Sequence, residues 1–342
     1  MINIISTQAK RAEISGPQKV FLNLVKGLEK IGYPYVINRD LNSTNRLWIH
    51  DDIFALKKMH HSKAKKIVGP NLFVMPKDIP QNISFDGVLY LQPCNWAVNM
   101  WKRANFASCP LAAWPVGIDT DVFYPSDLPL SKRKVLVYHK MRDIQELPPV
   151  FDILHEMHLN YSLVLYGEYL EEEYKRQLDE TSFIIWHGIA ESQGIAFQEA
   201  LACDIPILVW DVTSVSQTRG GYPFEPWTFQ VPVTAAPYFD DSCGIKIYNS
   251  GQLRESIETM LDNYKFYLPR EYILKNLSLE NQAKRFVKLW DHWNLTYESG
   301  LDDLPSNSHL WKGQSNLSKM TEKIIKKVKR ENNTSIKRGS NE

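Results

Sequence analysis

Short apolar runs alternate with amphipathic stretches along most of the chain, and this pattern predicts the order of its elements. A strand is expected at residues 2–5, followed by a polar loop and then a helix that ends at Gly32. In this helix apolar residues recur every three or four positions, Ser15 is a candidate N-cap, and Pro17 lies in the first turn. The same alternation continues more loosely, with strands expected at 47–50, 66–68 and 87–91 and a helix at 53–60.

A second series of the same kind follows a proline-rich stretch, residues 110–129, which is interpreted as a linker. Alternating strands and helices predict a parallel sheet covered by helices, so the chain is expected to be an α/β protein with two such halves. Ligands of open parallel sheets bind outside the carboxyl ends of the strands, which places the expected site in the cleft between the halves. The expected strands are 134–138, 161–166, 183–186 and 207–210, and the expected helices are 147–158, 170–178, 195–203, 250–264 and 280–293.

Length and composition narrow the class of protein without naming an activity. A chain of 342 residues is long enough for two domains, and 44% hydrophobic with 23% charged residues is an ordinary globular mixture. The net charge of +1 gives no field that favours nucleic acid, so no nucleic-acid partner is expected. Four cysteines without a zinc or disulfide pattern indicate reduced thiols and a cytoplasmic location. The longest uncharged runs, 87–101 and 104–118, are too short and too rich in proline and asparagine to span a membrane.

The segment from Glu191 to Ala202, ESQGIAFQEALA, carries the most informative chemistry. A strand, a short loop with an acid and a glycine, and a helix with a second acid, Glu199, follow one another here. Free N–H groups at a helix start bind anions, and Gly194 lets a ligand approach the backbone. Because a carboxylate accepts two hydrogen bonds from a vicinal diol, the pattern suits a nucleotide sugar, with Glu199 on the ribose and Glu191 on the hexose. In a purely structural interpretation, Glu199 is an ordinary residue near the helix start that the helix dipole stabilises, and Glu191 is a solvated loop charge.

This motif resembles the donor-site motif of retaining glycosyltransferases of family 4, which have the two-domain GT-B fold. The family's usual form is EGFG, four further residues, and EA; here Ser192 and Gln193 replace the Gly-Phe pair. A second match is WPVGIDTDVFYP at 114–125, which is similar to the family's interdomain segment. The resemblance implies two Rossmann-like, doubly wound parallel-sheet domains facing a cleft. It also implies donor contacts from Gln193, Gly194 and Ile195, a UDP- or GDP-linked donor, no cofactor and no metal.

Two further parts of the resemblance concern the donor diphosphate. The family places an Arg and a Lys after the first strand of the second domain. Here Lys140 takes the Arg position, while the Lys position falls near Glu146, so Arg142 substitutes for that Lys. Developing charge on a leaving diphosphate needs such cations, so both are assigned to catalysis and donor binding. Gly16 occupies the place of the family's N-terminal glycine loop, which contacts the donor. Without the resemblance, the cations are surface residues and Gly16 is a turn before a helix.

The expected acceptor side of the site is less defined. Relatives often have a histidine after the fourth strand, where this chain has Asn71, and His50-Asp51-Asp52 is an alternative polar cluster at a strand end. No general base is assigned, because in retaining transfer the leaving phosphate oxygen can take the acceptor proton. The segment 213–244 is rich in aromatic residues, which either pack under a long loop or stack on a sugar or base.

The predicted domains are an acceptor domain at 1–118, a donor domain at 119–280, a helix at 281–300 that returns to the first domain, and a basic tail at 301–342. From Trp311 onward nine basic and three acidic residues give a net charge of +6, which leaves −5 on the remainder. The tail is either a solvated terminus or a basic amphipathic helix over 319–330 that contacts anionic membrane.

The sequence therefore predicts a retaining hexosyltransferase that acts on a glycan, glycolipid or glycoprotein acceptor, which the sequence does not identify. The alternatives are another sugar-nucleotide enzyme on the same fold, an epimerase or phosphorylase, and a catalytically silent sugar-binding protein.

Overall fold

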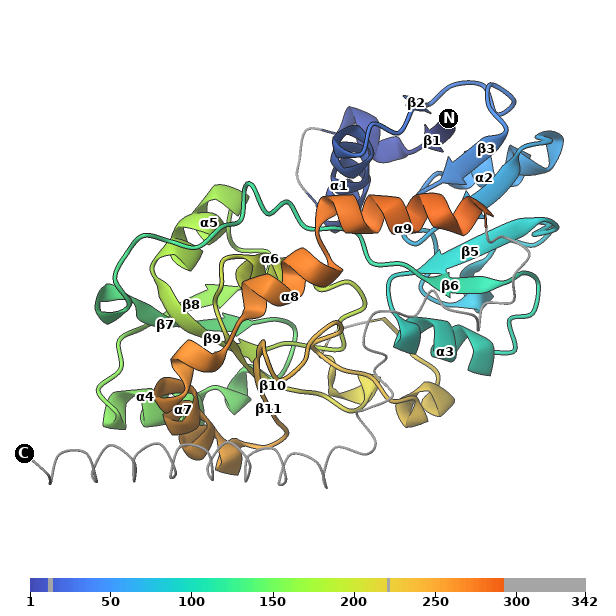
Figure 1. Cartoon of the computed structure of the whole chain (residues 1–342). Helices are drawn as coiled ribbons and strands as arrows, with labels where there is room; N and C mark the ends of the chain where they lie inside the picture. Colours follow the sequence, from blue (N-terminus) through green and yellow to red (C-terminus); the bar gives the residue numbers. More distant parts are fainter. Residues whose placement is uncertain (12–14, 220–221, 292–342) are drawn as a thin grey trace, which may run out of the picture. The chain divides into compact units, whose positions relative to one another are not determined.

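The computed structural model describes residues 1–11, 15–219 and 222–291, all of which belong to one compact unit (Figure 1). The predicted tail at 301–342, including its possible membrane helix, lies outside the described residues, as does the end of the predicted helix at 281–300. None of the described helices is both long and apolar enough to cross a bilayer.

The first half of the chain forms a six-stranded parallel sheet in the order β2-β1-β3-β4-β5-β6. The strand β6 lies inside the stretch expected to be a linker, and β2 and the helix α3 were not predicted. Both β1 and β5 are buried along their whole length, as strands covered on two faces should be. The bounds are β1 Ile2–Ile5, α1 Gly16–Lys30, β2 Tyr35–Ile37, β3 Arg46–Ile49, α2 Ile53–Lys58, β4 Lys65–Val68, β5 Val88–Gln92, α3 Asn95–Arg103 and β6 Leu111–Ala113.

The second half forms a five-stranded parallel sheet in the order β11-β10-β9-β7-β8. Two parallel sheets with helices confirm the expected fold class, an α/β protein with two Rossmann-like domains. The edge strand β11 and the helix α8 were not predicted. The bounds are β7 Lys134–His139, α4 Pro148–Glu156, β8 Tyr161–Leu165, α5 Glu171–Asp179, β9 Thr181–His187, α6 Ile195–Ala202, β10 Ile207–Trp210, β11 Gly244–Ile247, α7 Leu253–Asp262, α8 Pro269–Asn276 and α9 Leu279–Asp291.

The last described helix, α9, packs on the first domain, where it lies against α1 (Figure 1). The Phe286 ring of α9 lies 5.2 Å from the Trp48 ring and 5.0 Å from the Trp114 ring, between centroids. Two glycines permit this approach: a Cβ atom at Gly27 would lie 2.7 Å from the Leu279 carbonyl oxygen, and one at Gly117 would lie 2.6 Å from the Leu279 Cα. The chain therefore returns from the second domain to complete the core of the first.

Candidate active site

The helix α6 begins directly after a glycine that the backbone requires. Gly194 has the left-handed conformation, φ 68° and ψ 42°, which residues with a side chain rarely adopt. The Gln193 side chain makes two hydrogen bonds: its Oε1 accepts from the Val116 N–H at 3.1 Å, and its Nε2 donates to the Gln198 Oε1. Gln193 thus connects the loop to the interdomain segment, while Gly194 and Ile195 form the start of the helix. That start leaves backbone N–H groups of the first turn available to an anion.

Glu199, one turn into α6, is buried, and only one of its two carboxylate oxygens has a polar partner among the described residues. Its Oε1 lies 2.6 Å from the Lys19 Nζ of α1, and Lys19 also contacts Glu171 at 3.3 Å. Its Oε2 is buried and has no hydrogen-bond partner among the described residues. Burial raises the pKa of Glu199 to about 7, although the Lys19 charge opposes this rise. The structure thus places Glu199 where the two domains meet, in contact with Lys19 of the first domain through one carboxylate oxygen.

Glu191 meets Lys140 because their strands are neighbours. Lys140 follows β7 and Glu191 follows β9, and these two strands pair in the sheet. The two side chains form an ion pair, and the Lys140 ammonium also lies 4.2 Å from the centroid of the Tyr166 ring. Burial lowers the pKa of Lys140, but the charge of Glu191 and its hydrogen bond to Lys140 together outweigh burial and raise this pKa above its usual value.

The backbone of Glu191 is held from both domains. Its N–H donates to the Thr234 carbonyl at 2.9 Å, and its carbonyl accepts from the Trp96 Nε1 of α3 at 2.7 Å. The loop that contains Thr234 is fixed in turn by Asp211, which accepts from the Thr234 hydroxyl and from the Ala235 N–H. The acid of the motif is therefore anchored at the junction of the domains.

Arg142 is separated from the Lys140–Glu191 pair by the turn at Met141, which has a φ of 53°. Its Nη1 donates to the Trp210 carbonyl at 2.8 Å, and its Nη2 pairs with Glu146. Glu146 also binds the Nε2 of His187, whose pKa is lowered to about 4 by burial and by the Arg142 charge. The sequence grouped Arg142 with Lys140, but the contacts of the two cations differ.

Gly16 is the first residue of α1, three positions before Lys19, and a Cβ atom there would meet nothing within 4 Å. Its position does not itself require glycine, and residues 12–14, which precede it, are not described. Lys19 was not predicted, because a single lysine on the polar face of an amphipathic helix carries no sequence signal. Only the packing of α1 toward α6 reveals it.

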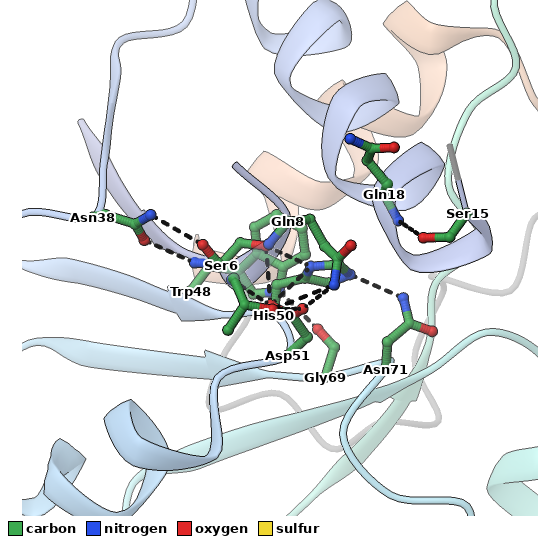
Figure 2. A network of polar contacts seen from close by, with 11 residues as sticks. Ser6, Gln8, Ser15, Gln18, Asn38, Trp48, His50, Asp51, Gly69 and Asn71 are labelled. Carbon is green, nitrogen blue, oxygen red and sulfur yellow. Dashed lines mark hydrogen bonds and ion pairs between the residues drawn. The ribbon is translucent and has the colours of Figure 1, made fainter. Parts of the chain in front are cut away.

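A network of buried polar groups lies at the carboxyl ends of β1, β3 and β4 (Figure 2). The fully buried His50 places its Nδ1 3.1 Å from the Ser6 hydroxyl and its Nε2 2.9 Å from the Asn71 Nδ2. Since an amide nitrogen only donates, His50 Nε2 accepts, and the ring proton sits on Nδ1. Burial opposes ionisation of Asp51, but hydrogen bonds from His50, Thr7 and Gln8 outweigh it and hold the Asp51 pKa below its usual range.

The third residue of that sequence cluster, Asp52, has a local role. Its carboxylate accepts from the Phe54 and Ala55 N–H groups and caps α2. Of the cluster, His50 and Asp51 thus belong to the network that holds Asn71, and Asp52 does not.

The aromatic segment at 213–244 mostly packs. Tyr222, Phe224, Trp227 and Phe239 are partly buried against a core cluster that includes residues of both domains. Phe224 in addition lines a pocket of about 300 Å³ that Ser192 and residues after β4 and β5 also line. A pocket therefore adjoins the motif loop on the side of the first domain.

No family model matches the sequence, and neither does any curated protein. Among solved structures, sucrose-phosphate synthase from Thermosynechococcus elongatus is similar at a TM-score of 0.57 and 11% identity, over 85% of this chain and 98% of that one. AviGT4, a glycosyltransferase involved in avilamycin A biosynthesis, is similar at a TM-score of 0.54 and 11% identity, over 85% and 97%. At such identities the likeness shows the fold, which is the two-domain GT-B architecture.

Proposed function

We propose that this protein is a retaining glycosyltransferase that moves a hexosyl group from a nucleotide diphospho-sugar to a hydroxyl-bearing acceptor. One observation carries the proposal: Glu199 is buried at the domain junction with a carboxylate oxygen that no described residue binds. A buried, unsatisfied carboxylate costs free energy unless a ligand supplies hydrogen bonds. The two hydroxyls of a ribose supply them, with the diphosphate at the adjacent helix start.

The remaining site residues take roles that fit their contacts. The first N–H groups of α6, at Gly194 and Ile195, bind the diphosphate. Lys140 compensates the charge that develops on the leaving diphosphate, and Arg142, held by Glu146, is the second cation. Glu191 binds the hexose once Lys140 turns from it to the diphosphate. These groups supply positive charge without a metal, and we propose metal-independent transfer.

The proposed transfer with retention needs no side chain as a general base. The bond between the anomeric carbon and the diphosphate oxygen breaks, and the acceptor oxygen bonds to the same face of that carbon. The acceptor proton passes to the departing diphosphate oxygen. Glu191, released from Lys140, stabilises the positive charge of the sugar in the transition state.

The test is incubation with UDP-, GDP-, ADP- and CMP-sugars, chosen by thermal shift, followed by product analysis with and without glycoside acceptors. We expect transfer that keeps the anomeric configuration and is lost in Glu191→Ala, while the folded state persists by circular dichroism. Full activity of Glu191→Ala would overturn the assignment. Conversion of the donor alone would indicate an epimerase, and binding with neither transfer nor donor hydrolysis a silent sugar-binding protein.

A further inference from the structure

The pocket beside the motif loop is built almost entirely by the first domain. It has a volume of about 300 Å³, at the lower end of small-molecule sites. Asn71 and Gln92 line it at the ends of β4 and β5, Trp96 and Met100 line it from α3, and Ser192 closes it from the second domain. Because Ser192 follows Glu191 directly, a molecule in this pocket lies next to the acid that we assign to the hexose.

The lining of the pocket is uncharged. None of the fourteen described residues that form it is Asp, Glu, Lys, Arg or His, and most are apolar or aromatic. A charged group that entered would lose its hydration without an opposite charge in the wall, which disfavours its binding strongly. The pocket therefore selects against phosphorylated and carboxylated ligands.

Two neutral amides provide the hydrogen-bonding groups of the pocket. Gln92 is only 4% exposed, and its side-chain Nε2 has no hydrogen-bond partner among the described residues. The Nδ2 of Asn71 is committed to His50, so the carbonyl oxygen of this amide is left for the pocket. A donor and an acceptor set in apolar walls match a hydroxyl group, which both donates and accepts.

Trp96 connects the pocket to the loop that contains Glu191. Its ring lines the pocket, while its Nε1 donates to the Glu191 carbonyl at 2.7 Å. An aromatic wall suits the C–H face of a pyranose ring and leaves the ring hydroxyls for the amides. The same side chain thereby fixes the distance between this wall and the motif loop.

We infer that this pocket binds the acceptor as an uncharged sugar unit, with Gln92 and Asn71 as ligands of its hydroxyls. The inference rests on the proposed function, which it deepens by naming the acceptor class. Asn71 is positioned by His50, and His50 by Ser6 and Asp51, so the buried network of Figure 2 serves to orient an acceptor ligand.

The experiment titrates the full chain, with and without UDP, with methyl β-glucoside, methyl β-galactoside, methyl α-mannoside and methyl N-acetyl-β-glucosaminide, and with methyl β-glucuronide as the charged partner of the glucoside. Binding is read by saturation-transfer NMR. We expect at least one neutral glycoside to bind, and the glucuronide to bind at least tenfold more weakly than the glucoside. Gln92→Met, which keeps the side-chain length and removes the amide, should weaken the neutral ligand at least fivefold, whereas the exposed control Gln81→Met should not.

Three results would overturn the inference: no neutral glycoside binds in either condition, the glucuronide matches the glucoside, or Gln92→Met binds like the wild type. Nucleotide-sugar binding is measured separately by thermal shift on the same samples. Glycoside binding without any nucleotide-sugar binding would contradict the proposed function and leave the pocket assignment standing. Nucleotide-sugar binding without any glycoside binding would contradict the pocket assignment alone.

Discussion

At the scale of single residues, the two glutamates of the motif are set up for different tasks. Glu191 has a cation, Lys140, as its partner on the neighbouring strand. Glu199 is more deeply buried, which raises its pKa toward neutrality, and one of its oxygens has no hydrogen-bond partner among the described residues. A ligand that brings two hydroxyls to Glu199 favours its ionised form, so donor binding and proton release are linked.

This linkage predicts pH-dependent donor binding. With a pKa of about 7, Glu199 is increasingly protonated as the pH falls below 7 and loses the lone pairs that accept the ribose hydroxyls. The dissociation constant of the donor, measured by calorimetry, should rise about fivefold between pH 7 and pH 6 and stay nearly constant above pH 8. Glu199→Gln should bind weakly at every pH, and a variant that kept the wild-type profile would contradict the role of Glu199.

Lys140 should matter for the rate of transfer. Lys140→Met keeps much of the side-chain volume and removes the charge that compensates the leaving diphosphate. We expect a fall in kcat of roughly 100- to 1,000-fold, the usual cost of losing one such electrostatic contact. The exposed Lys132→Met, in the same domain, is the control and should transfer like the wild type. Equal rates in the two variants would remove Lys140 from the mechanism.

The sequence singled out Lys140, Glu191 and Glu199 because the first two follow strands and the third lies one turn into a helix. It could not separate Arg142 from Lys140, because the left-handed turn at Met141 sends the two side chains to different partners. Lys19 also escaped prediction, since its significance comes from a contact between residues 180 positions apart.

At the scale of elements, the close packing of α9 on the first domain depends on glycines. In Gly117→Ala the added Cβ would lie 2.6 Å from the Leu279 Cα, a backbone atom that cannot move alone. We expect the free energy of unfolding, measured in urea, to fall by about 1–3 kcal/mol. Gly16→Ala is the matched control, because the new methyl group meets nothing within 4 Å, and it should leave stability nearly unchanged. Equal stability of the two variants would contradict the packing.

The long and strongly patterned elements were predictable, and the short or marginal ones were not. β10 was expected at its observed bounds, since its uninterrupted apolar run is typical of a buried parallel strand. β2 and β6 have three residues each, and β6 lies between prolines that resemble a linker. β11 is an edge strand that begins with a glycine and contains a lysine, so it lacks that apolar run.

At the scale of the whole described molecule, the interdomain segment acts as a structural tie. The Ile118 N–H donates to the Leu277 carbonyl at 2.7 Å, and the Arg270 guanidinium donates to the carbonyls of Phe123 and Ala202. The segment thus joins both domains to the turn before α9. The residues that match an interdomain motif therefore pack between the domains, and we assign none of them to catalysis.

A metal-independent mechanism predicts that chelation has no effect. In the proposed mechanism the positive charge comes from Lys140, Arg142 and the start of α6, so transfer in excess EDTA should match transfer in added Mg²⁺ or Mn²⁺. A loss of activity in EDTA that Mn²⁺ restores would contradict this part of the proposal.

The central claim is that the domain junction holds a nucleotide diphospho-sugar through Glu199 and the start of α6. Calorimetric titration of the wild type and Glu199→Gln with UDP- and GDP-sugars at pH 8 tests it most directly. The account predicts saturable binding of at least one donor to the wild type and at least tenfold weaker binding to the variant. Equal binding to both proteins, or no binding of any nucleotide sugar to the wild type, would contradict it.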